Sequence, residues 1–328
     1  MNNIFYLKTH KTGSSTLAEI LYRYGDNRNL TFVLPKGKID FNWPKRFQLS
    51  NTMPLYAEEG KILCSHTRYN KGPANLLFPK SKSKYITILR HPVSQFESAF
   101  AFYKVAKKLG LKDDSNPIQT FFRNTKAFAR RLKWTDKLLK NPSIFDLGLD
   151  WKYFQNGTVL RYIRFIEDEF DLVLINEYYD ESLILLKHLL CWDFEDILYL
   201  KQKVRVRRAS LSDEIKAKIL SWSQADLLLY NHFNNTLWRK ISEAGDKFYE
   251  DLQVFREMKK ILEEACLPEI EKGKIVEGRE EHYPNKYLQM CAQMSREIPR
   301  YLEYTKKHMQ KKWEAVDTTY NFERLTTK

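Results

Sequence analysis

Cysteine is scarce in this sequence, and long hydrophobic runs are absent. Four of the 328 residues are cysteine, and Cys64, Cys191, Cys266 and Cys291 are too widely spaced to form the C-x-x-C pairs of a zinc site. The sequence leaves open whether they form disulfides or remain buried thiols. No stretch is long enough to cross a membrane, and we find no signal peptide. We therefore expect either a cytosolic protein or one whose membrane anchor lies outside this sequence.

Acidic residues are fewer than basic ones in this sequence. Forty-one Asp and Glu residues stand against 55 Lys and Arg, a net charge of +14. This balance favours anionic partners such as nucleotides, acidic glycans or membrane surfaces. We find no sequence signature of DNA or RNA recognition, so nucleic acid is not an expected partner. With 43% hydrophobic and 14% aromatic residues, the composition is that of a globular protein.

Short apolar runs alternate with helical patterns. Residues 4–7, 61–66, 85–90 and 170–175 read as strands. Strands that alternate with helices predict an α/β fold of the P-loop-like, three-layer kind, with a central parallel sheet flanked by helices. We expect this domain to span residues 1–240 and a helical extension to span residues 241–328, with helix breaks near Gly245 and Pro299. Helical signals in the interval 112–160 are weak. Val93, Phe96 and Phe100 recur at helical spacing, and we expect them to face the core.

The segment from Lys11 to Thr16 joins the first strand to the first helix. Its backbone N–H groups, the positive end of the helix and Lys11 form a cradle for a phosphate group. The simpler alternative is a turn with a capping serine. The segment departs from the Walker A loop of kinases, because Lys11 precedes Gly13 and no second glycine is present. It therefore suits a single terminal phosphate better than a triphosphate.

A second candidate anion site follows the third apolar run. Arg90 ends that run and Ser98 lies eight residues further on, in a helix that begins near Pro92. A guanidinium group with a hydroxyl suits a phosphate. Because ligands of parallel sheets bind beyond the strand carboxyl ends, we group this pair with Lys11 and with His66, which ends the second run. Two anion sites predict a nucleotide that carries two separate phosphate groups.

These motifs resemble those of the Golgi galactose 3-O-sulfotransferases. The segment Lys11 to Thr16 looks like the 5′-phosphosulfate loop of sulfotransferases, and Arg90 with Ser98 looks like their 3′-phosphate motif. Further segments similar to the family are 7–12, 64–69, 88–98, 177–183, 190–196 and 230–234. The resemblance runs from about residue 4 to residue 240.

The resemblance implies a donor and roles for individual residues. The donor is 3′-phosphoadenosine 5′-phosphosulfate, whose sulfuryl group passes to a sugar hydroxyl without a metal ion. Lys11 would neutralise the bridging oxygen, and Thr12, Gly13, Ser14, Ser15 and Thr16 would hold the 5′-phosphate. Arg90 and Ser98 would hold the 3′-phosphate. His66 is our candidate base, with His10 as the alternative.

The resemblance also implies an acceptor and a location. The expected acceptor is galactose at the end of a glycolipid or glycoprotein glycan, and the expected location is the Golgi. Glu177 and Asp180 would either contact the acceptor or support the helix that follows them. The basic run 201–208 would either close over the nucleotide or remain a solvated loop. A small-molecule kinase and a non-catalytic protein that binds nucleotides or acidic glycans are the alternative functions.

Overall fold

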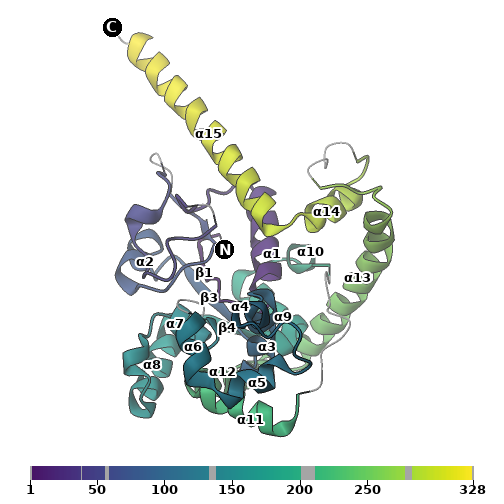
Figure 1. Cartoon of the computed structure of the whole chain (residues 1–328). Helices are drawn as coiled ribbons and strands as arrows, with labels where there is room; N and C mark the ends of the chain where they lie inside the picture. Colours follow the sequence, from purple (N-terminus) through teal and green to yellow (C-terminus); the bar gives the residue numbers. More distant parts are fainter. Residues whose placement is uncertain are drawn as a thin grey trace.

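A parallel sheet forms the centre of the molecule (Figure 1). The computed structural model describes residues 2–37, 39–55, 59–132, 138–200, 211–277 and 283–326, with side chains up to residue 314 except that of residue 156. Within these ranges the sheet has four strands, all parallel, in the order β2-β1-β3-β4. The strands are β1 (Ile4–Leu7), β2 (Ile62–Leu63), β3 (Lys84–Leu89) and β4 (Leu172–Ile175). The α/β fold predicted from the sequence is confirmed.

Helices surround this sheet and continue to the C-terminus. In chain order, the described α-helices are α1 (Ser14–Asp26), α2 (Lys71–Leu77), α3 (Pro92–Phe102), α4 (Val105–Leu109), α5 (Pro117–Arg123), α6 (Thr125–Leu132), α7 (Pro142–Asp146), α8 (Asn156–Glu169), α9 (Tyr179–Leu190), α10 (Phe194–Ile197), α11 (Asp213–Trp222), α12 (Gln224–Ala244), α13 (Asp246–Glu271), α14 (Lys286–Ser295) and α15 (Ile298–Thr326). Short 3₁₀ turns are η1 (Leu49–Asn51), η3 (Trp151–Tyr153) and η4 (Asn176–Tyr178).

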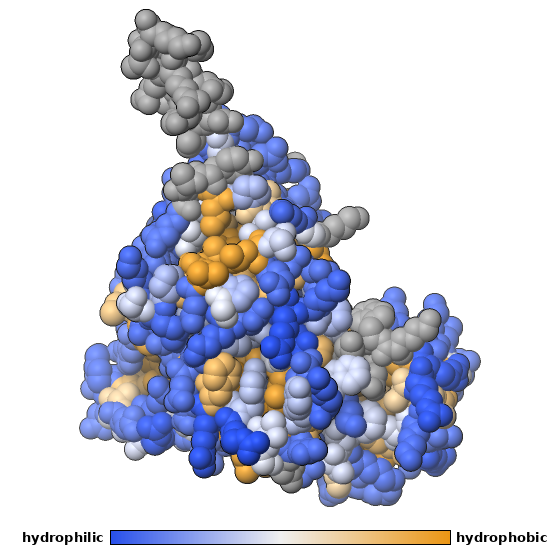
Figure 2. All heavy atoms as spheres, turned by 90° about the vertical axis from the view of Figure 1, so that its left-hand side faces the viewer, coloured by the Kyte–Doolittle hydropathy of each residue, from blue (hydrophilic) through white to orange (hydrophobic). Residues whose placement is uncertain are grey.

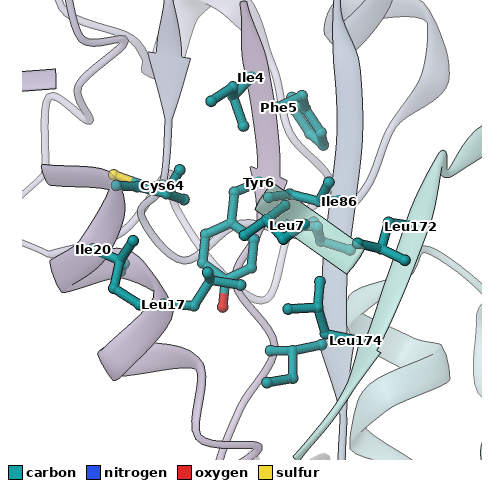
Figure 3. Packing of buried hydrophobic residues seen from close by; sticks show 14 of the residues in the cluster. Ile4, Phe5, Tyr6, Leu7, Leu17, Ile20, Cys64, Ile86, Leu172 and Leu174 are labelled. Atoms are coloured by element: carbon teal, nitrogen blue, oxygen red, sulfur yellow. The ribbon is translucent and has the colours of Figure 1, made fainter. Parts of the chain in front are cut away.

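The first strand is buried on both of its faces. Every residue of β1 has an exposed fraction of 0%. Figure 3 shows the side chain of Tyr6 beside Leu17 and Ile20 of α1, with Leu174 of β4 close by. Burial on both faces explains why the strands read as continuous apolar runs rather than as alternating patterns. This dry, close-packed core fixes where β1 ends, and the loop that follows is therefore held in place.

The carboxyl ends of the strands lie at one edge of the sheet. Leu7 pairs with Thr87, and Leu89 pairs with Ile175. The second strand is shorter than the predicted run 61–66, because only two residues pair as a strand. A further parallel bridge nevertheless joins Lys8 to His66. The register of the sheet thus brings residues 8 and 66 together although 58 positions separate them.

A second apolar cluster lies beside the main core. Val93, Phe96 and Phe100 of α3 were predicted to face the core, and they are buried in this cluster. Their partners come from α4, α5, α6 and α11. The interval 112–160, which gave only weak helical signals, therefore contributes real helices whose apolar side chains complete a cluster around α3.

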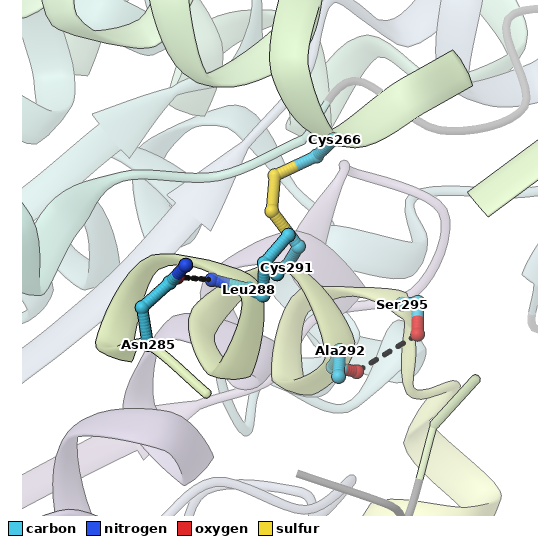
Figure 4. The surroundings of a disulfide bond; sticks show 6 residues. All are labelled: Cys266, Asn285, Leu288, Cys291, Ala292 and Ser295. Carbon is cyan, nitrogen blue, oxygen red and sulfur yellow. Dashed lines mark hydrogen bonds between the residues drawn. A yellow bond between two sulfur atoms is a disulfide. The ribbon is translucent and has the colours of Figure 1, made fainter. Parts of the chain in front are cut away.

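The C-terminal helices follow the predicted breaks. Gly245 separates α12 from α13 with a φ of 66°, and α15 begins just before Pro299 and projects from the body (Figure 1). A disulfide between Cys266 and Cys291 joins α13 to α14, as Figure 4 shows. Cys64 and Cys191 are free thiols. The predicted boundary at residue 240 stays a prediction.

The face shown in Figure 2 is mainly hydrophilic, with apolar side chains gathered in separate patches. Among the described helices, none combines the length and the apolar character that a membrane span needs.

Candidate active site

The loop after β1 is tied to the sheet and to its own first helix. The hydroxyl of Thr9 donates a hydrogen bond to the carbonyl oxygen of Ile88, with an O···O distance of 2.5 Å. The hydroxyls of Thr9 and Thr12 are 2.7 Å apart, and Ser14 Oγ donates to the Thr9 carbonyl at 2.6 Å. Thr12 and Ser14 are buried. Their hydroxyl groups therefore shape the loop from within.

Gly13 makes the sharp turn into α1. Its φ of 79° is a left-handed conformation that side chains disfavour. A Cβ atom at this position would lie 2.1 Å from Oδ1 of Asn176, which belongs to the η4 turn after β4. The hydroxyl of Tyr179 also donates to the Gly13 carbonyl at 3.4 Å. The loop is therefore packed closely against the end of β4.

The N-terminus of α1 has the features of an anion site. No side chain caps it, and its first turn contains no acidic residue. The first N–H groups of a helix lack partners within the helix, and its dipole makes this end positive. Ser15 is exposed here and Thr16 is partly exposed. An anionic group placed at this end would accept hydrogen bonds from these N–H groups, and no carboxylate in the first turn competes for them.

Lys8 places a buried ammonium group beside this helix end. Its Nζ lies 3.2 Å from Ser15 Oγ and 3.1 Å from Nε2 of His66, and the residue is 4% exposed. Burial lowers the pKa of Lys8 to about 8, against the opposing effect of Glu19. Lys8 therefore carries a positive charge at neutral pH and is ready to contact an anion.

His66 is held as one neutral tautomer. Its Nδ1 lies 2.9 Å from the Lys8 carbonyl oxygen, which can only accept, so Nδ1 carries the proton. Nε2 is then the acceptor that faces the Lys8 ammonium group. Burial, together with the charges of Lys8 and His10, places the pKa of His66 well below its ordinary value. The ring is thus neutral, as a base must be, but its lone pair is directed at Lys8.

His10 is paired with a buried carboxylate. Its Nδ1 and its backbone N–H donate to Oδ2 of Asp146 at 2.8 and 2.9 Å. Asp146 is fully buried, and its Oδ1 accepts a hydrogen bond from Nε1 of Trp43 at 2.8 Å. The His10 ring stacks on His66 with centroids 4.2 Å apart. A carboxylate on Nδ1 leaves Nε2 as the acceptor, which is the arrangement of a histidine general base.

Buried polar contacts hold Asp146 in position. Asp146 ends the short helix α7, and at the other end of α7 the carboxylate of Asp226 accepts the N–H groups of Ser143 and Ile144 at 2.9 and 2.8 Å. Gln95 of α3 donates to the His10 carbonyl at 2.7 Å and to Ser143 Oγ at 3.0 Å. Helices α3, α7 and α12 therefore fix the loop that carries His10.

Arg90 connects the second predicted anion site to the first. Its Nη1 donates to the Lys11 carbonyl oxygen at 3.3 Å. Ser98 lies partly buried in α3, the helix that follows Arg90. Lys11 itself has a φ of 60°, and its Nζ lies 3.6 Å from the ring centroid of Phe102. The structure thus brings Arg90 to the loop and directs the Lys11 side chain to α3.

Comparison with known proteins identifies the family. The family model described as galactose-3-O-sulfotransferase matches residues 1–279. The chain belongs to this family. The match covers the sheet, the loop after β1 and the residues around His10 and His66. The resemblance predicted from the sequence motifs is therefore confirmed.

Named relatives are about one third identical to this chain over the aligned region. A human protein named galactosylceramide sulfotransferase is 34% identical over 273 residues, which cover 81% of this chain and 64% of the relative. A mouse protein named galactose-3-O-sulfotransferase 3 is 33% identical over 272 residues, 80% of this chain and 63% of the relative. A human protein named galactose-3-O-sulfotransferase 2 is 34% identical over 277 residues, 81% and 68% respectively. The aligned region thus spans less than two thirds of the length of the first two of these relatives.

Asp180 and Glu177, two charged residues after β4, both make contacts within the protein. Asp180 lies in the first turn of α9, and its carboxylate binds Nζ of Lys259 at 2.6 Å and the hydroxyl of Tyr199 at 2.8 Å. These contacts fit the structural alternative that the sequence left open, and an acceptor contact stays untested. Glu177 accepts a hydrogen bond from the backbone N–H of His91 at 3.1 Å, which ties η4 to the start of α3. The basic run 201–208 lies outside the described residues.

Sequence reasoning assigned no role to several residues of this site. Lys8 stands in a stretch where Lys11 matched the motif, and only the bridge to His66 shows that Lys8 is the buried ammonium group. Asp146 and Trp43 lie in irregular regions without a recognisable motif, and folding alone brings them to His10. Among the described side chains, no group of three or more His, Cys, Asp or Glu residues is placed to hold a metal ion.

Proposed function

We propose that this protein transfers the sulfuryl group of 3′-phosphoadenosine 5′-phosphosulfate to the 3-hydroxyl of galactose, on a glycolipid or a glycoprotein glycan. Membership of the galactose-3-O-sulfotransferase family supports the class of reaction and the sugar. The observation that carries the proposal is the uncapped N-terminus of α1, with the buried Lys8 ammonium group and the His10–Asp146 pair beside it. These features combine an anion site with a base.

The donor fits the residues that surround the loop. The N–H groups at the start of α1, with Lys11 and Ser15, would hold the 5′-phosphosulfate, and Arg90 with Ser98 would hold the 3′-phosphate. Lys8 adds a cation to which the sequence motifs assigned no role. The hydrogen bond from Arg90 to the Lys11 carbonyl couples the two anion sites. Thr12 and Ser14 would contribute backbone groups, since their hydroxyls face the loop interior.

For this transfer the protein must align the acceptor with the donor and compensate the charge that develops on the leaving phosphate. The acceptor hydroxyl oxygen forms a bond to sulfur as the bond from sulfur to the bridging phosphate oxygen breaks, and the hydroxyl proton passes to a base. Lys8 and Lys11 stabilise the negative charge that grows on the leaving phosphate. No covalent intermediate with the protein and no metal ion are needed. Positioning and electrostatics supply the rate enhancement.

Two histidines compete for the role of base. His66 is the residue that the motifs favour, and its neutral form suits the role. Its Nε2 is engaged by Lys8, whereas Nδ1 of His10 is engaged by Asp146 and leaves Nε2 as the acceptor. The geometry therefore supports His10 at least as well as His66. With the rings stacked at 4.2 Å, a hydroxyl bound to one lies close to the other.

The disulfide supports a location in the secretory pathway. Disulfides form and persist in oxidising compartments, and Cys266–Cys291 is such a bond. This agrees with the Golgi location proposed from the family resemblance. A Golgi enzyme would meet its glycolipid and glycoprotein acceptors there.

A radiolabel assay tests the function. The protein is incubated with ³⁵S-labelled donor and a panel of galactosides, with and without EDTA, and in parallel with labelled ATP and Mg²⁺. We expect label on a galactoside, unaffected by EDTA. Label from ATP that requires Mg²⁺ would support a kinase instead. Tight binding of 3′-phosphoadenosine 5′-phosphate without any product would support a binding protein.

Matched variants identify the base. We compare H10A with H66A in single-turnover transfer and measure 3′-phosphoadenosine 5′-phosphate binding by calorimetry. Loss of the base lowers the rate by about 10²-fold or more, whereas loss of a supporting ring costs less. Each variant must bind the nucleotide as the wild type does for its rate to be interpreted. Equal, small losses in both variants would remove both histidines from the role.

A further inference from the structure

A row of aromatic rings runs outward from His10. The ring of Trp43 lies 4.7 Å from that of His10, and the ring of Phe145 lies 6.1 Å from Trp43. Trp151 continues the row at 6.1 Å from Phe145. We call Trp43, Phe145 and Trp151 the aromatic row. It begins at His10, one of the two candidate bases.

The row is accessible at both ends and closed in the middle. Trp43 is partly exposed and Trp151 is 49% exposed, whereas Phe145 is 3% exposed. The guanidinium group of Arg68 lies 4.0 Å from the centre of the Phe145 ring. Phe145 therefore packs against both tryptophans and fixes them. The two tryptophan rings provide the surface that a ligand would touch.

The residues beside Trp151 offer hydrogen bonds. Asp150 accepts from Arg68 at 2.7 Å and from Arg46 at 3.2 Å, and the side chains of Arg46 and Asp150 are 45% and 37% exposed. Arg46 also donates to the Gly148 carbonyl at 2.8 Å. Planar charged groups at the rim of an aromatic surface suit a ligand that has both an apolar face and many hydroxyl groups.

A galactosyl ring has that chemistry. Its axial 4-hydroxyl leaves the C–H groups of C3, C4 and C5 together on the opposite face, where they form an apolar patch. Its 3-hydroxyl is equatorial and points outward from the ring edge. A ring stacked by its apolar face on an aromatic side chain therefore still presents the 3-hydroxyl to a neighbouring base. In a glucosyl ring the 4-hydroxyl is equatorial, so this edge presents a different arrangement of hydroxyl and C–H groups.

We infer that Trp43 is the platform on which the accepting galactosyl group stacks, and that Trp151 extends this platform to the next unit of the acceptor. This inference rests on the proposed function and names the acceptor subsite. Trp43 binds the sugar through its ring face and holds Asp146 through Nε1. The same side chain thus connects the acceptor to the carboxylate that orients His10.

Steady-state kinetics with simple sugars tests the subsite. We compare the wild type with W43A, W43F and W151A, and with Y249A as the control, because Tyr249 is 55% exposed on α13 outside the row. The acceptors are methyl β-galactoside, methyl β-glucoside and a galactose-terminated disaccharide. Calorimetry with 3′-phosphoadenosine 5′-phosphate measures the donor site separately.

We expect W43A to raise the KM for methyl β-galactoside by about tenfold, as the loss of one aromatic contact predicts. W43F keeps a ring but loses the contact to Asp146, so its kcat should fall more than its KM rises. W151A should raise the KM for the disaccharide and leave that for the monosaccharide within about twofold of the wild type. Y249A should change neither constant, and nucleotide binding should be unchanged throughout.

Unchanged KM values, for methyl β-galactoside in W43A and for the disaccharide in W151A, would overturn the inference. If W43A fails to fold, W43F and W151A still test the inference. W43F should lower kcat more than it raises KM, and W151A should raise the KM for the disaccharide. A wild type that neither binds the nucleotide nor transfers sulfate would instead refute the proposed function. Quenching of tryptophan fluorescence by methyl β-galactoside that is lost in W43F and retained in W151A would then still establish the sugar site.

Discussion

Nζ of Lys8 lies 3.1 Å from Nε2 of His66, although the two residues are 58 positions apart. The parallel bridge between the segments after β1 and β2 produces this contact. It places a buried cation between the helix end that would hold the donor and the pair of histidines that would receive a proton. Lys8 is therefore positioned to act on the donor phosphate and to influence the base.

The ionisation of Lys8 predicts how activity depends on pH. Its pKa is about 8, below its ordinary value, because burial disfavours the charged form. The ammonium form dominates below pH 8 and is lost above it. We expect kcat to fall as the pH rises through about 8. In K8R the guanidinium group stays charged, so this descending limb should disappear at a lower maximal rate. A limb that stays at pH 8 in K8R would assign it to another group.

Removing the charge of Asp146 tests the His10–Asp146 pair. In D146N the single amide oxygen cannot accept hydrogen bonds from both residue 10 and Trp43, and the negative charge beside the His10 ring is lost. We expect kcat to fall about 10²-fold or more while nucleotide affinity changes little. D213N serves as the control because Asp213 is exposed on α11, where it is paired with Lys216. Equal kcat values in both variants would argue against His10 as the base.

Gly13 should tolerate no side chain. Its left-handed φ opposes G13A, and so does Oδ1 of Asn176, which lies 2.1 Å from the position that the alanine Cβ would take. Gly110 has nearly the same φ, 78°, but no atom within 4 Å of a Cβ, so G110A isolates the backbone cost, about 1 kcal/mol. Chemical denaturation should show a larger loss of stability for G13A than for G110A. Nucleotide binding should weaken in G13A alone. Identical behaviour of the two variants would show that the contact with Asn176 is unimportant.

Asp226 should make folding stability depend on pH. Burial raises its pKa to about 7, and the N–H groups of Ser143 and Ile144 oppose that shift only in part. Because the native state then binds a proton that the unfolded state releases near pH 4, the free energy of unfolding contributed by this group falls as the pH rises towards 7. D226N should flatten this dependence in urea titrations from pH 5 to pH 8. D213N, at an exposed position, should retain the wild-type slope.

The disulfide between α13 and α14 should stabilise the C-terminal helices. It closes a loop of 25 residues, which corresponds to about 3 kcal/mol in the chain-entropy model. In calorimetry we expect C266S, C291S and the reduced wild type to show a similar decrease in Tm relative to the oxidised wild type. C191S removes an exposed free thiol and should keep the wild-type Tm. If reduction leaves the Tm of the wild type unchanged, the cross-link contributes no stability.

Part of the fold could be read directly from local patterns. The apolar runs around β1, β3 and β4 are buried on both faces and therefore continuous, so they were easy to recognise. Gly245 and Pro299 indicated helix breaks because glycine permits a positive φ, whereas proline fixes φ and lacks the backbone N–H that a helix interior needs. The second strand was predicted too long, since burial continues through Ser65 while strand pairing stops at Leu63. The interval 112–160 gave weak signals because its helices are short.

The sequence by itself determined the α/β class and the family, and it predicts phosphate binding by Lys11 to Thr16, because all three depend on contiguous residues with fixed spacing. Only the tertiary structure decided that Lys8 faces His66, that Asp146 orients His10 and that Trp43 lies beside them. These contacts join segments 58 and 136 residues apart. No local pattern encodes such pairs, since the register of the parallel sheet and the packing of α7 against α12 and α3 bring them together.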